Sequence, residues 1–110
     1  MPNPTKLRYK IPTSNTDGSA LTQAQIKSIE IGLGTTTGQY PTIKADVTFA
    51  PGADGFSEEL LSVFGALTPG TYFAAARTVS TANIMSAWSN EAVFIIEPPI
   101  PSPPTSFEIA

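Results

Sequence analysis

Apolar side chains recur at every second position in several short runs, and this period of two constrains the fold most strongly. Leu7, Tyr9 and Ile11 alternate with Arg8 and Lys10. Such alternation places the two sets of side chains on opposite faces of a β-strand, with the apolar face buried. The same reasoning predicts four further strands: Ile29, Ile31 and Leu33; Ile43, Ala45, Val47 and Phe49; residues 71–79; and residues 88–96.

Turn-forming residues separate these runs, as at Asp17-Gly18 and Pro69-Gly70. Glycine accepts a positive φ angle, and proline fixes φ and has no N–H to donate to a strand ladder. A chain of 110 residues is long enough for one domain with one hydrophobic core. Short strands joined by turns in a chain of this length predict a single all-β sandwich.

The segment 56–64 has an ambiguous period. Its apolar residues have helical spacing: Phe56, Leu60, Val63 and Phe64. Ser57 is a possible N-cap, and a short strand over residues 61–64 also fits. We expect a short helical turn in this segment.

Composition argues against several classes of function. The chain has no Cys and no His, so it cannot form a disulfide, a thiolate metal site or a Ser–His–Asp triad. Its net charge of −3, with only six basic residues, argues against nucleic acid as a partner. Asp17 and Asp54 each place one carboxylate in a glycine-containing loop, which favours turn capping over calcium binding. We therefore expect no enzyme activity, no cofactor and no bound metal.

Three stretches resemble, in order, the fibronectin type III family in its bacterial and phage form. They are NTDGSALT, IEIGLGTTTGQY, and LTPGTYF followed by SAWSNEAVF. The resemblance implies an immunoglobulin-like sandwich of about seven strands, with segment 56–64 in the place of strand E. It also implies structural roles for Tyr72 and Trp88, with the Tyr72 hydroxyl bonded to the upstream backbone as a tyrosine corner. Ala74 and Ala76 stand where the family usually has larger side chains.

The order of the segments differs from that of the family. Residues 6–11 resemble strand B, whereas the proline-rich end of the chain resembles an interdomain linker and a strand A that ends with Phe107 and Ile109. We expect a sandwich over residues 1–97 that starts at strand B, and a tail over residues 98–110. The tail segment can fill the edge of strand B in its own molecule, fill it in a neighbour, or remain unpaired.

The loops at one end of the sandwich are the other predicted contact region. The loop 80–85 contains Ile84 and Met85, two apolar residues that we expect to be exposed. Loops of this kind carry binding in many sandwiches. Ile84, Met85, Phe107 and Ile109 are therefore the candidate partner contacts.

These features together predict a non-catalytic structural or protein-binding module. A small sandwich with strand-like ends looks similar to accessory proteins of phage particles, such as capsid decoration or tail components, which implies a virion location after assembly in the host cytoplasm. Expected partners are copies of the chain itself or a capsid or tail protein. No membrane span or secretion signal is apparent in the sequence. The alternative is an adhesion or carbohydrate-binding module of a larger protein that is secreted or at the cell surface, with Trp88 as a weak candidate for sugar contact.

Overall fold

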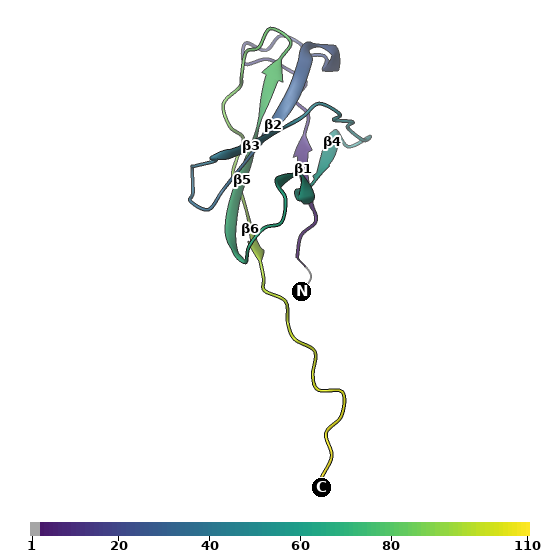
Figure 1. The fold of residues 1–110 in the computed structure, drawn as a ribbon. Helices are drawn as coiled ribbons and strands as arrows, with labels where there is room; N and C mark the ends of the chain where they lie inside the picture. The colour runs from purple at the N-terminus through teal and green to yellow at the C-terminus, as the bar shows by residue number, and fades with distance from the viewer. Residues whose placement is uncertain (1–2) are drawn as a thin grey trace.

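The computed structural model describes residues 3–110, so the first two residues of the predicted domain 1–97 lie outside the described residues. Two antiparallel sheets pack face to face as a β-sandwich (Figure 1). The smaller sheet pairs β1 (Lys6–Lys10) with β4 (Phe56–Leu60). The larger sheet has the order β3-β2-β5-β6, formed by β3 (Thr42–Asp46), β2 (Ile26–Gly34), β5 (Gly70–Ser80) and β6 (Ala92–Ile96). The all-β prediction is confirmed, with six strands among the described residues.

The core lies between the two sheets, where the alternating runs place their apolar side chains. Tyr9 and Ile11 from the side of β1 pack with Ile29 and Ile31 of β2. A second cluster, nearer the β6 side of the large sheet, contains Leu33, Tyr72 and Ala74. The period of two in β1 and β2 therefore identified the buried face of each strand.

Strand β3 presents its apolar residues to the outside instead. Ile43 is 41% exposed and the neighbouring Val47 is 66% exposed, whereas Asp46 is 4% exposed. The register with β2 explains this, because Ile43 is opposite Gly32, which lies on the outer face between the inward-pointing Ile31 and Leu33.

The segment 56–64 begins as a strand, so the predicted helical turn was wrong for its first half. All five residues of β4 are opposite β1, from Phe56 beside Lys10 to Leu60 beside Lys6. This ladder outweighs a weak local helical spacing. Only the short 3₁₀ helix η2 (Leu61–Phe64) follows it, and the alternative strand over these four residues was wrong as well. The other 3₁₀ helix, η1 (Gln23–Gln25), precedes β2.

The last strand is shorter than the predicted run 88–96, because β6 begins only at Ala92. Before it, the chain follows β5 through isolated hydrogen bonds, from the Ser86 N–H to the Thr78 carbonyl at 2.8 Å and from the Ser89 N–H to the Ala76 carbonyl at 2.7 Å. These bonds do not extend into a continuous ladder.

The tail, residues 98–110, is fully exposed and has no helix or strand. It leaves the sandwich beside the N-terminal end and extends away from it (Figure 1), which gives the molecule a longest dimension of 77 Å. The start of the tail is fixed to the sandwich, because the Glu97 N–H donates to Asn3 Oδ1 at 2.9 Å and Asn3 Nδ2 donates to the Glu97 carbonyl at 3.3 Å.

Candidate protein-binding surface

The edge of β1 is open. Among residues 3–110, β1 pairs with β4 on one side and with no strand on the other. The flanking bonds from the Ile11 N–H to the Gly55 carbonyl and from the Leu61 N–H to the Thr5 carbonyl show that the odd-numbered residues face β4. Because bonding alternates along an antiparallel pair, the N–H and C=O groups of Lys6, Arg8 and Lys10 point to the open edge.

An apolar groove of about 340 Å³ lies beside this edge, between the two sheets. Leu7 and Tyr9 of β1 form one side, and Ala74 and Ala76 of β5 form the other, with Ile31 also contributing. The small alanine side chains leave the space open. Larger side chains fill this space only in part, since Phe49 and Phe64 pack against the core cluster of Tyr9 and Ile31, and of the two sheets' phenylalanines only Phe56 lines the groove.

A second groove of about 440 Å³ continues toward the opposite end of the sandwich from the tail. It shares Ala76 and Ser89 with the first groove. Ile84, 69% exposed, and Met85, 54% exposed, line it from the loop after β5, and Leu21 lines it from the loop before β2. The two predicted contact residues in this loop therefore belong to one apolar surface that leads to the open edge.

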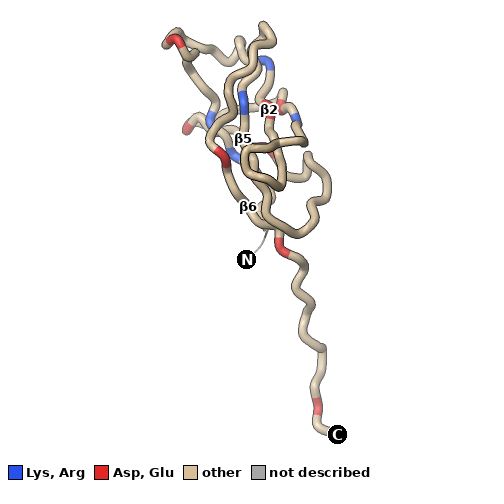
Figure 2. Tube along the Cα trace, turned by 90° about the vertical axis from the view of Figure 1, so that its left-hand side faces the viewer, with Lys and Arg blue, Asp and Glu red and all other residues tan. Residues whose placement is uncertain are grey.

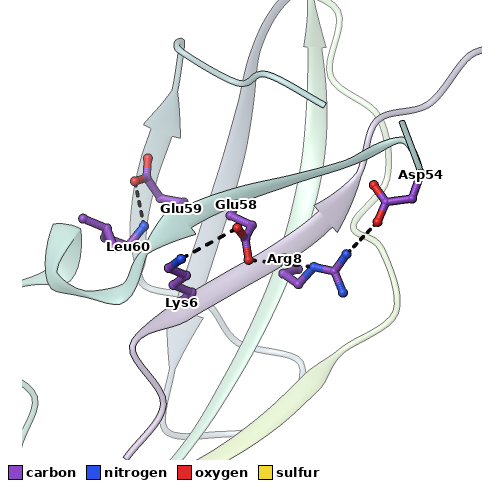
Figure 3. Close-up of polar contacts among 6 residues, drawn as sticks. All are labelled: Lys6, Arg8, Asp54, Glu58, Glu59 and Leu60. Atoms are coloured by element: carbon purple, nitrogen blue, oxygen red, sulfur yellow. Dashed lines mark hydrogen bonds and ion pairs between the residues drawn. The ribbon is translucent and has the colours of Figure 1, made fainter. Parts of the chain in front are cut away.

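The outer face of β1 carries a row of cations. Figure 3 shows Lys6 and Arg8 reaching Glu58 of β4, with Arg8 also paired to Asp54 at 3.0 Å. Lys10, the third cation of the row, has no ion pair within 4.0 Å in the described part of the chain. The resemblance to strand B implied an unfilled edge at residues 6–11, and the structure shows that these cations border it.

Phe107 and Ile109 lie far from this surface within one molecule. They are 91% and 90% exposed, near the end of the extended tail. Glu108 lies between them in the sequence, and Figure 2 shows acidic colouring near the tip of the tail. The structure therefore does not bring the tail residues and the loop residues Ile84 and Met85 together in a single chain.

Trp88 lies half-buried on the outer face of the large sheet. The Arg77 guanidinium stacks over its ring at 4.3 Å, and the Tyr40 ring packs against it with centroids 5.0 Å apart. Arg77 also donates to Glu30 Oε1 at 2.7 Å. Gly32 lies directly below, where a Cβ atom would be 2.6 Å from the Cβ of Tyr40 and 2.9 Å from the ring of Trp88.

Glu91 fixes the neighbouring loop to the same face. Its carboxylate accepts bonds from the Gly38 N–H at 2.8 Å, the Thr37 hydroxyl at 2.7 Å and the Tyr40 hydroxyl at 2.8 Å. These three donors, with the Gly38 amide first, hold the pKa of Glu91 below its ordinary value, and the bond to Glu91 raises the pKa of Tyr40.

Tyr72, near the start of β5, is buried, and its hydroxyl donates to the Thr68 carbonyl at 2.6 Å. This bond to the backbone upstream is the one that the sequence predicts for a tyrosine corner. The Tyr72 ring also stacks on Phe94 of β6, with centroids 5.4 Å apart.

Comparison of the chain with protein-family models, with curated proteins and with solved structures gives no significant match. Within residues 3–110 no cluster of three or more acidic side chains has the arrangement of a metal site. None of the helices in this part of the chain is long and apolar enough to cross a membrane.

Proposed function

We propose that this protein is a non-catalytic structural module that binds protein partners by β-strand addition at the open edge of β1. The observation that carries the proposal is the juxtaposition of unpaired N–H and C=O groups on β1 with an apolar groove. An extended segment placed there gains main-chain hydrogen bonds from the edge and side-chain burial in the groove.

We further propose that the sandwich is of the fibronectin type III kind. The pairing of β1 with β4, and the order β3-β2-β5-β6, fit strands B and E facing strands C′, C, F and G of that family. The Tyr72 corner at the start of β5 supports the same assignment. In this correspondence the open edge of β1 is the position that strand A occupies.

The biological setting that we propose is a phage particle, in which the module is a capsid decoration or tail protein. Its support is architectural: one sandwich with an open edge and an extended apolar-tipped tail suits repeated contacts in an assembly. Mass spectrometry of purified particles from the source of the gene tests this setting. The protein should be present at many copies per particle, and its absence from the particles would contradict the setting.

The binding activity is tested separately, with a displayed library of random peptides. The bait is the variant F107S/I109S, whose own tail has lost its two apolar anchors. We expect selected peptides with alternating apolar residues, and we expect them to slow hydrogen exchange at Lys6, Arg8 and Lys10. Recovery of no peptide, or protection confined to other strands, would refute the proposed binding site.

Carbohydrate binding by an adhesion module is the second candidate, with Trp88 as the stacking platform. It has weaker support, because Arg77 already covers one face of the Trp88 ring. Glycan binding by the native protein that is lost in Trp88→Ala would favour this alternative.

A further inference from the structure

We propose that the occupant of the open β1 edge is residues 105–110 of a second copy of this chain, with Phe107 and Ile109 seated in the groove. The proposal rests on the proposed function, because it names the partner for the same edge. It is carried by three observations: the side-chain pattern of the tail, the charge along β1, and the length of chain that links the tail to its own sandwich.

The side-chain pattern of residues 105–110 matches the groove. Phe107 and Ile109 are two positions apart, so they lie on one face of a strand. In a strand added beside β1 that face points between the sheets, toward Leu7 and Ala74. The six residues contain no proline, so every backbone N–H in them is available for a ladder.

Charge fits the same orientation. When Phe107 and Ile109 face the groove, Glu108 lies on the outer face, beside the cations of β1. Lys10 has no ion pair within 4.0 Å among the described residues. Glu108 is the only charged residue in the tail, so it supplies the complementary charge.

The tail cannot complete its own sandwich in an antiparallel sense. It starts level with Asn3, to which Glu97 is hydrogen-bonded. From Asn3 to Lys10 the strand rises by about 23 Å. An antiparallel strand would have to start beyond Lys10 and run back toward Asn3. Residues 98–104 span only about 22 Å as polyproline II, so they are too short to pass Lys10 and turn back.

A parallel return along its own β1 is also unfavourable. It would place residues 98–104 beside β1, and five of these seven residues are prolines. Proline has no N–H to give to the ladder, and its ring obstructs close pairing. The apolar pair Phe107 and Ile109 would then lie beyond the end of the groove.

A second copy meets neither obstacle. The tail extends away from its own sandwich and enters the neighbour from the end that carries Ile84 and Met85. The proline-rich segment then lies over the second groove, and residues 105–110 run antiparallel to β1. Each copy uses its tail as donor and its edge as acceptor, so the contact is head-to-tail and builds chains or closed rings.

Complementary variants of the full chain test this pairing. F107S/I109S removes the anchors of the donor and leaves the acceptor edge intact. Arg8→Pro blocks the acceptor, because the Arg8 N–H points to the open edge and contributes no bond to β4. The masses of each variant and of an equimolar mixture are measured by light scattering after size exclusion, from micromolar to millimolar protein.

We expect the native protein to gain mass with concentration and each variant to remain at the monomer mass of 11.6 kDa. The mixture should form a complex of twice that mass, because it contains one working tail for each working edge. A native protein that stays monomeric, folded variants that do not associate when mixed, or variants that oligomerise alone would overturn the proposal.

Matched controls separate pairing from general damage. Ile100→Ser removes another exposed apolar residue of the tail, outside residues 105–110, and Arg8→Thr removes the charge but keeps the N–H. Both should still gain mass with concentration, because each keeps the two apolar anchors and every N–H of the ladder, whereas F107S/I109S and Arg8→Pro should stay monomeric. Circular dichroism verifies that each variant is folded. If Arg8→Pro unfolds, Ala76→Leu replaces it as the blocked acceptor, because the larger side chain fills the groove from β5.

The peptide-display result distinguishes the two proposals. If displayed peptides protect the β1 edge while the variant mixture stays monomeric, the edge binds strands but the partner is not a second copy. If displayed peptides fail as well, the binding site itself is wrong.

Discussion

The Tyr9 hydroxyl donates a hydrogen bond to the Asp46 carboxylate, and this contact joins the small sheet to the large one. Tyr9 is in β1 and Asp46 ends β3, and both are buried. The other carboxylate oxygen accepts the Thr48 N–H at 3.0 Å and the Thr48 hydroxyl at 3.2 Å. Burial and the bond to Asp46 raise the pKa of Tyr9, so the hydroxyl stays protonated as a donor.

Tyr9→Phe should therefore destabilise the protein by about 1.5–3 kcal/mol, the usual range for a lost hydrogen bond to a charged group. Urea unfolding followed by Trp88 fluorescence measures the change. In the double-mutant cycle with Asp46→Asn, the effects of the two changes should be less than additive. Additive effects would mean that the contact contributes nothing to the joining of the sheets.

Tyr72→Phe removes the hydroxyl that bonds the Thr68 carbonyl and keeps the ring that stacks on Phe94. We expect a loss of about 1 kcal/mol in the free energy of unfolding, with an unchanged denaturant slope. Tyr72→Leu, which also loses the aromatic stack, should cost more. Equal stability of Tyr72→Phe and the native protein would argue against a structural role for the corner.

Glu91 should make stability depend on pH in the acid range. Its pKa lies below the ordinary value of 4.5 in the folded protein, so its stabilising effect is complete above 4.5 and is lost as pH falls through the folded-state pKa. Glu91→Gln should flatten the fall in stability over that window, as measured by thermal unfolding at a series of pH values. Glu108→Gln in the tail is the control, measured at a concentration too low for association, and should follow the native profile.

Gly32→Ala should disturb the packing on the outer face of the large sheet. The added methyl group would meet the Tyr40 side chain and the Trp88 ring at distances shorter than ordinary contact. We expect a cost of about 1–3 kcal/mol together with a shift in Trp88 fluorescence. Gly18→Ala supplies a comparison in open space, where the cost comes only from its positive φ angle of 88°. A Gly32→Ala variant with native fluorescence would show that the Trp88 ring moves aside freely.

The sequence was most informative where a pattern was local. The alternation in residues 7–11 and 29–33 predicted both the strands and their buried faces. It was less informative at 56–60, where helical spacing competed with a strand, because only the partner strand β1 decides between them. It also gave no sign that Asp46 is buried, since that depends on the register of β3 against β2 and on the Tyr9 hydroxyl across the core.

The candidate binding surface also combines features that the sequence predicted with features that only the structure shows. The sequence identified Phe107 and Ile109 as a strand-like pair, and Ile84 and Met85 as exposed loop residues. It did not indicate the groove between β1 and β5, although Ala74 and Ala76 appeared small for their positions. A groove arises from the distance between elements remote in sequence, and no local pattern contains that distance.

By itself, then, the sequence determined an all-β chain with a proline-rich, apolar-tipped tail, because side-chain period and proline act through the local backbone. The resemblance implied an unfilled edge at residues 6–11, but only the tertiary structure decided that this edge lies beside a groove and that Ala74 and Ala76 border it. Strand pairing is made by hydrogen bonds between segments far apart in the chain, so the surroundings of an unpaired edge become visible only when the pairing and packing of the strands are known.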